Sequence, residues 1–112
     1  MNIEEDSYKL TYQDGVISLS GKLSLMLEDY ARLDAFFEEI IASEPSFLVL
    51  DIRNLEYLNS SGIKTICVGL ILEAADIEGL GMKILCSGQY TWQKETVPTF
   101  EDLMDDMEIV FE

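Results

Sequence analysis

The sequence predicts an α/β fold, a mixed and mostly parallel sheet of about five strands with helices mainly on one side. Two segments that alternate apolar and polar residues flank Gln13-Asp14-Gly15, a pattern typical of a β-hairpin. After this hairpin, amphipathic helical stretches alternate with short apolar runs. The resulting order, β-β-α-β-α-β-α-β, implies right-handed crossovers between neighbouring parallel strands.

Residues 8–12 and 16–20 are the predicted hairpin strands, with Gly21 expected to end the second strand and residues 22–27 forming a loop. Residues 28–43 are predicted to be helical, because apolar side chains recur there every three or four residues. That apolar stripe comprises Tyr30, Leu33, Phe37, Ile40 and Ile41. Glu28 and Asp29 lie in the first turn, where the helix dipole favours acids, and Pro45 ends the helix.

Residues 47–52 are nearly all apolar, which predicts a central strand covered on both faces. A second helix is expected over residues 61–78, ended by Gly79 and Gly81. Its expected buried stripe is Ile63, Ile66, Cys67, Leu70, Ile71, Ala74 and Ala75. Residues 82–86 and 108–111 complete the strands. A short third helix is predicted to start at Thr99, with Phe100, Leu103 and Met104 facing the core.

The chain has 112 residues, enough for one domain with one core, so we expect a single domain over residues 1–112. Apolar residues make up 48% of it, a globular composition. No stretch reaches the ~18 apolar residues that a membrane helix needs. The N-terminus is acidic and lacks the apolar core of a signal peptide, so we expect a cytoplasmic location.

Acidic residues outnumber basic ones by 22 to 7, which gives a formal net charge of −15. This balance disfavours nucleic acids and anionic membranes as partners, because both are bound through clusters of Lys and Arg. It is compatible with a basic protein partner. It is equally compatible with acids that only keep the domain soluble.

The chain contains no histidine and two cysteines, Cys67 and Cys86, far apart in the sequence. Without histidine, Ser-His-Asp and Cys-His catalysis within this chain are excluded. Metal ligands usually come in close pairs, so we expect no metal site, and we predict no other cofactor. Both cysteines are expected to be buried, small apolar residues.

The most informative segment is Asn59-Ser60-Ser61-Gly62, which follows an apolar run and opens the second helix. A helix N-terminus favours negative charge, so a serine there is well placed to carry a phosphate. The alternative is that Ser60 and Ser61 only cap the helix. Lys64, one turn beyond Ser61, is either a partner for such a phosphate or an ordinary exposed lysine.

This order of elements, with Asn-Ser-Ser-Gly at the start of the second helix, resembles the STAS domain, named after sulphate transporters and anti-sigma factor antagonists. The resemblance runs from about residue 8 to residue 112. Residues 16–24 look like the family's second strand with its Gly-x-Leu-Asp ending, and residues 47–62 look like the strand and the Asp-Ser-Ser-Gly loop. Residues 83–87 and 100–111 look like the closing strands and helix.

The resemblance implies a regulatory protein-binding module of a bacterial partner-switching system, like an anti-sigma factor antagonist. In the family, a serine kinase of the histidine-kinase-like ATPase fold, which also acts as the anti-sigma factor, phosphorylates the second serine of the loop. A PP2C-type phosphatase reverses this modification. Carried over by position, Ser61 is the phosphoacceptor, Ser60 is its neighbour and the second candidate, and Gly62 permits close approach.

The partner-binding residues expected on this basis are Ser24, Asn59, Ser60, Ser61, Gly62 and Lys64. Two of them depart from the family's pattern. Asn59 stands where the family has the Asp before the serines, and Ser24 stands where it has the Asp after Gly-x-Leu. Asn59 can still cap the helix through its side-chain oxygen, and we expect a divergent subgroup of the family.

Three functions compete at this point. The first is a binding module switched by serine phosphorylation, and the second is a STAS-like scaffold without a phosphosite. The third is an enzyme with Ser61 as nucleophile, which has the least support because Lys64 is the only nearby base.

Two surface features also have alternative interpretations. Trp92 is either a packing residue or an interface anchor. Leu23, Leu25, Met26 and Leu27 either fold under the first helix or form a patch that faces a partner.

Overall fold

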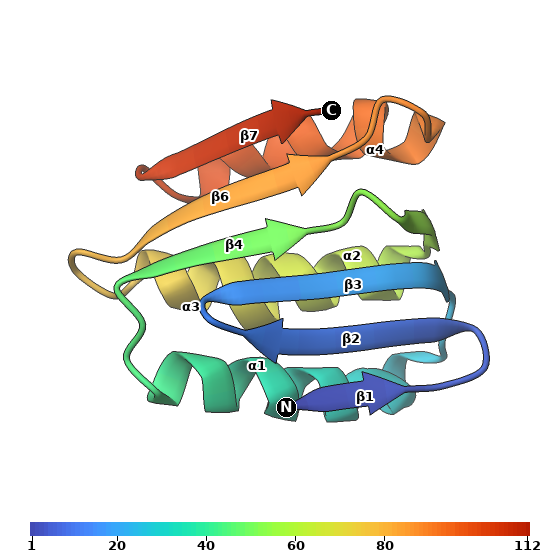
Figure 1. The fold of residues 1–112 in the computed structure, drawn as a ribbon, viewed down its shortest axis with the longest axis horizontal. Coiled ribbons are helices and arrows are strands. Elements are labelled where there is room, and N and C mark those ends of the chain that lie inside the picture. The colour runs from blue at the N-terminus through green and yellow to red at the C-terminus, as the bar shows by residue number, and fades with distance from the viewer.

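The computed structural model describes residues 1–112 and contains a seven-stranded sheet with the helices gathered on one face (Figure 1). The strands are β1 (Asn2–Glu4), β2 (Tyr8–Gln13), β3 (Val16–Leu23), β4 (Phe47–Asp51), β5 (Leu55–Leu58), β6 (Gly81–Cys86) and β7 (Met107–Phe111). The α-helices are α1 (Ala31–Ala42), α2 (Ser60–Ile66), α3 (Leu72–Ala75) and α4 (Thr91–Thr96). Two 3-10 segments, η1 (Leu27–Tyr30) and η3 (Val97–Leu103), and a π-helical segment, η2 (Cys67–Ile71), complete the helical layer.

The strands follow the order β1-β2-β3-β4-β6-β7, and β5 pairs with β3 beside this path. The pairs β1–β2 and β2–β3 are antiparallel, whereas β3–β4, β3–β5, β4–β6 and β6–β7 are parallel. The predicted mixed, mostly parallel sheet with helices mainly on one side is therefore confirmed. The predicted number of strands is too low, because β1 and β5 were not expected.

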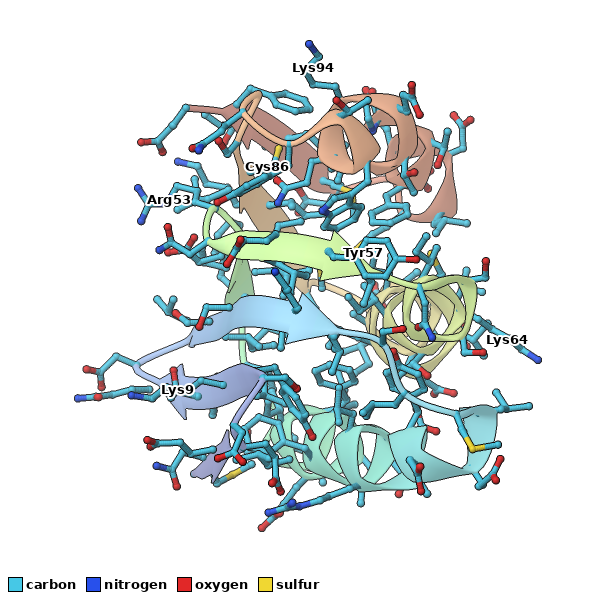
Figure 2. All side chains as sticks on the ribbon, turned by 90° about the vertical axis from the view of Figure 1, so that its right-hand side faces the viewer. Lys9, Arg53, Tyr57, Lys64, Cys86 and Lys94 are labelled. Carbon is cyan, nitrogen blue, oxygen red and sulfur yellow. The ribbon has the colours of Figure 1, made fainter.

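The buried apolar side chains form one cluster of 27 residues between the sheet and the helices. Figure 2 views this arrangement edge-on, with the sheet on the left and the helices on the right. In the first predicted helix Tyr30, Leu33, Phe37 and Ile40 are fully buried, as the periodicity predicts, and Ile41 is half-buried. Because each helix buries one stripe, its opposite face stays open to solvent.

Strand β3 does not end at Gly21, contrary to the sequence prediction. Gly21 has φ +94°, and a Cβ added there would lie 2.3 Å from the Ser7 carbonyl oxygen, so only glycine fits. Residues 16–18 of β3 pair with β4, whereas residues 21–23 pair with β5, and the register of this second pairing shifts between Gly21 and Lys22. This change of partner brings β5 beside the end of β3.

The second predicted helix runs as α2, η2 and α3, with a π turn in its middle. The N–H of Leu72 donates to the carbonyl of Cys67, five residues back, which adds one residue to that turn. Leu70, Ile71 and Ala74 are buried as predicted, but Ala75 is exposed. Ala75 is the last residue of α3, which ends there with Asp76 as its C-cap.

Two further predictions are wrong. Strand β4 is covered on one face only, because all helices lie on the same side of the sheet (Figure 2), and Phe47 at its start is exposed on the uncovered side. The third helical region begins at Thr91 rather than Thr99, and Pro98 lies at the start of η3. Phe100 and Met104 are nevertheless buried and Leu103 is half-buried, as the sequence predicts.

None of the helices is both long enough and apolar enough to cross a lipid bilayer.

Candidate functional site

The predicted site residues meet at the edge of the sheet where the parallel strands end. Leu23 at the end of β3 pairs with Leu58 at the end of β5, so the residues that follow them, Ser24 and Asn59, leave the sheet side by side. The N–H of Asn59 donates to the Leu23 carbonyl at 3.2 Å. Figure 2 faces this edge of the molecule.

Asn59 is the N-cap of α2 and connects three parts of the chain. Its Oδ1 accepts a hydrogen bond from the N–H of Gly62 at 3.0 Å, and its Nδ2 donates to the carbonyl of Leu25 at 2.8 Å. Because the Gly62 N–H can only donate and the Leu25 carbonyl can only accept, the orientation of the amide is fixed. The side chain therefore holds the loop after β3 against the start of α2.

The hydroxyl of Tyr30 completes this network from below. It lies 2.5 Å from Asn59 Oδ1 and accepts from the N–H of Leu25 at 3.3 Å. Tyr30 is fully buried, and burial raises its pKa above the ordinary value. A proton on the phenol is what allows it to donate to Asn59.

Gly62 is buried directly beside this hydroxyl. A Cβ at Gly62 would lie 2.7 Å from the Tyr30 oxygen and 2.3 Å from a methyl carbon of Leu58. The absence of a side chain at Gly62 therefore makes room inside the domain. Gly62, predicted to be one of the partner-binding residues, is buried and supports that surface from beneath.

Ser60 and Ser61 occupy the first two positions of α2, and neither hydroxyl makes a hydrogen bond within the chain. Ser60 is exposed and Ser61 is half-buried. The cap is the Asn59 side chain, so the alternative in which the two serines only cap the helix is wrong. Their backbone N–H groups belong to the first turn, which has no acceptor within the helix.

Lys64 lies one turn beyond Ser61, is exposed and forms no ion pair. In Figure 2 its side chain extends away from the sheet and from the rest of α2. Five of the six predicted residues therefore share one stretch of surface, which we call the serine rim: Ser24, Asn59, Ser60, Ser61 and Lys64.

Tyr57 was not among the predicted site residues, although its side chain is 49% exposed near the end of β5, two residues before Asn59. It is labelled in Figure 2 on the same edge as Lys64. The sequence does not predict strand β5, in which Tyr57 lies. Tyr57 is the only residue of this segment with a strong strand preference, which is a weak signal.

The structure decides between the two interpretations of Trp92. Its indole Nε1 donates to the Leu55 carbonyl at 3.1 Å, and its ring packs against the core, so it is a packing residue. The neighbouring Gln93 is fully buried and bonds to the carbonyls of Ile52 and Leu55 and to the N–H of Ser87. These contacts hold β5 in place below the serine rim.

The apolar loop after β3 is partly packed under the first helical region and partly exposed on the surface. Leu23 is buried and Leu25 is half-buried, whereas Met26 and Leu27 are exposed. The first two residues anchor the loop and the second two remain on the surface.

Both thiols are free, with Cys86 buried and Cys67 half-buried. Burial raises the pKa of Cys67, and it raises the pKa of Cys86 to about 11, so both are protonated at neutral pH. No group of three or more His, Cys, Asp or Glu residues is arranged to hold a metal ion. The cysteines therefore behave as the small apolar residues that the sequence predicts.

Neither a family model nor a curated protein sequence matches this chain. Solved structures do match it. One is the complex of the diguanylate cyclase SiaD with its activator SiaC from Pseudomonas aeruginosa, where the match to SiaC has a TM-score of 0.72 and 19% identity. That match covers 100% of this chain and 99% of the other.

A second match is an anti-sigma factor antagonist from Mycobacterium paratuberculosis, with a TM-score of 0.62 and 20% identity. It covers 91% of this chain and 84% of the other. The chain therefore has the STAS-like α/β fold that its sequence predicts.

Proposed function

We propose that this protein is a regulatory protein-binding module that changes partners when a serine of the serine rim is phosphorylated. Ser61 is the primary phosphoacceptor and Ser60 is the second candidate. The expected partners are a serine kinase with the histidine-kinase-like ATPase fold and a PP2C-type phosphatase. In this role the chain acts by binding and has no catalytic activity of its own.

One observation carries the proposal: Asn59 caps α2 and leaves both serine hydroxyls without a structural role. A serine hydroxyl at the start of a helix, next to unpartnered N–H groups, is a favourable place for a phosphate dianion. Lys64, free of ion pairs, lies one turn away and adds a positive charge.

The structural neighbours support a regulatory role. SiaC is described as the activator of a cyclase with which it forms a complex, and the mycobacterial protein as an anti-sigma factor antagonist. Both act on other proteins. We transfer this mode of action, and not the identity of either target, to the present chain.

Phosphorylation would act on binding through charge. A phosphate adds about −1.5 to −2 charges to a chain whose formal net charge is already −15. If the unmodified serine rim is covered by the partner, the dianion enters a desolvated contact, where an unpaired charge is costly. The modified protein would then release that partner while its own fold is unchanged.

The second candidate function is a scaffold of the same fold that is never phosphorylated. The half-buried position of Ser61 favours this alternative, because a kinase reaches an exposed hydroxyl more easily. Mass spectrometry of protein purified from its native cells separates the two functions. Trypsin cleaves after Arg53 and Lys64, so one peptide, residues 54–64, contains Ser60 and Ser61 together with Tyr57.

The decisive experiment is labelling by the co-purifying kinase with radioactive ATP. Wild type should be labelled and Ser61→Ala should not. Ser87→Ala, which removes a hydroxyl outside the serine rim, is the control and should be labelled like wild type. Labelling lost only in Ser60→Ala would move the site by one residue, and absence of the phosphopeptide from native protein would favour the scaffold.

A further inference from the structure

A groove runs along the outer surface between α1 and the continuous helix formed by α2, η2 and α3. Two adjoining hollows of about 300 and 230 Å³ make up this helix groove. They share Glu38, Gly69 and Glu73. The remaining lining residues are Leu27, Asp34, Ile41, Ala42, Lys64, Thr65 and Val68. At its Lys64 end the helix groove adjoins the serine rim.

Large apolar side chains line the helix groove and are open to solvent. Leu27 and Val68, which line it, are 59% and 49% exposed, and Leu72, one turn beyond Val68, is 40% exposed. With Met26, they are four of the eight large apolar residues exposed anywhere in the chain. Gly69 keeps the floor low, since a Cβ there would lie 2.7 Å from Asp34 Oδ1.

The charges that border the helix groove are acidic and unpaired. Asp34, Glu38 and Glu73 line it, and none of them forms an ion pair. The only basic residue in the lining is Lys64, at the end beside the serine rim. An occupant must therefore bring apolar side chains for Leu27 and Val68 and positive charges for the three carboxylates.

We infer that the helix groove binds an amphipathic α-helix with basic flanks, presented by a partner protein. The twelve residues of α1 span ~18 Å, so the groove accommodates about three turns of a second helix. Apolar residues of that helix at positions i, i+3 or i+4, and i+7 would contact Leu27, Val68 and Ile41, as in other helix-in-groove complexes. Lys or Arg on either side of its apolar stripe would face Asp34, Glu38 and Glu73.

A second copy of this chain is a poor occupant, because two molecules of net charge −15 repel each other. The inference rests on the proposed function only in that the chain binds a protein partner. It needs no phosphate and no kinase. The two can therefore fail independently.

The probe is a fluorescein-labelled 14-residue amphipathic helix of Leu and Lys, titrated with unmodified protein at physiological salt and followed by fluorescence anisotropy. Glu38→Lys combined with Glu73→Lys should weaken binding at least tenfold. The matched control is Glu101→Lys combined with Asp102→Lys, which makes the same change of charge at exposed positions of η3. It should weaken binding no more than twofold.

A second pair of variants tests the apolar contacts. Val68→Ser with Leu72→Ser should weaken binding at least tenfold. Phe47→Ser with Phe111→Ser removes side chains that are 48% and 41% exposed elsewhere and should weaken it no more than twofold. Urea unfolding checks that each variant is folded.

Three results would overturn the inference. Equal losses in the groove and control variants would show unspecific attraction between charges. Amide NMR shifts induced by the peptide away from α1 and residues 64–73 would place the binding surface elsewhere. A dimer in sedimentation that Glu38→Lys with Glu73→Lys dissociates would make a second copy the occupant.

Discussion

The Tyr30 hydroxyl lies 2.5 Å from Oδ1 of Asn59, and this contact joins the base of the first helical region to the cap of α2. Every polar group of Asn59 has a partner. Its backbone N–H donates to the Leu23 carbonyl, and its backbone carbonyl accepts from the N–H of Ile63. In the side-chain amide, Nδ2 donates to the Leu25 carbonyl and Oδ1 accepts from the N–H of Gly62. The orientation of the serine rim therefore depends on a buried phenol that no partner touches.

Asn59→Asp should destabilise the protein, although an aspartate can also cap a helix. The carboxylate can accept from Tyr30 and Gly62 but cannot donate to the Leu25 carbonyl, which loses its partner. An unsatisfied group of this kind costs about 1–3 kcal/mol in the free energy of unfolding. Asn54→Asp adds the same charge at an exposed turn and should change it by less than ~0.5 kcal/mol. Equal urea midpoints for the two variants would contradict this network.

Tyr30→Phe should lower the free energy of unfolding by about 1–3 kcal/mol, because it leaves the Leu25 N–H without an acceptor and removes a donor from Asn59. Tyr57→Phe, at an exposed phenol, is the control and should stay within ~0.5 kcal/mol of wild type.

The same variant should alter the pH dependence of stability. Burial holds the pKa of Tyr30 above 10.0, so the folded state keeps a proton that the unfolded chain releases near pH 10. This contribution is fully present below pH 10 and is lost as the pH rises through the folded pKa. Wild-type stability in urea should therefore fall more steeply above pH 10 than that of Tyr30→Phe. The slope that remains should come from Tyr8 and from the two thiols, Cys67 and Cys86, because burial raises the pKa of all three groups.

Leu70→Ala should cost ~2–5 kcal/mol, since its side chain is fully buried on the core side of the π turn. Leu72→Ala, two residues further along and exposed, should cost less than ~1 kcal/mol in the same urea titration. Similar losses at both positions would mean that the helix faces are assigned wrongly.

Ser61→Asp should bind the kinase at least ~10-fold more weakly than wild type, a difference of ~1.4 kcal/mol. Its amide NMR spectrum should stay close to that of wild type, because the helix N-terminus accepts the negative charge. Ser87→Asp controls for added charge outside the serine rim. Binding by genuinely phosphorylated protein at wild-type strength would reject the switch.

The sequence predicts the helices well where one period of apolar residues is unbroken. Leu33, Phe37 and Ile40 are buried because residues 31–42 form a regular α-helix against the sheet. The predicted stripe is wrong at Ala75, which is exposed at the end of α3, and the π turn at residues 67–71 was not predicted. No local sequence pattern in residues 67–71 indicates a π turn.

The candidate site could be predicted in position but not in architecture. The Asn-Ser-Ser-Gly segment identifies the helix start, and the structure places Ser24 beside it, as expected. The contributions of Tyr30 and Leu25 to the cap could not be predicted from the local sequence. Tyr30 lies 29 positions before Asn59, and Leu25, in the loop after β3, lies 34 positions before it. Strand β5 was not predicted, because a segment of four residues is too short for its alternation of apolar and polar residues to be distinguished from a turn.

The π turn also has a consequence for how this sequence evolved. One additional residue within a helix whose two ends are held by tertiary contacts is equivalent to a one-codon insertion that the fold has absorbed. Homologues with an uninterrupted α-helix should therefore align with a single-position gap opposite residues 67–71. Lineages with and without the gap would then be expected to differ in which partners their helical surface accepts.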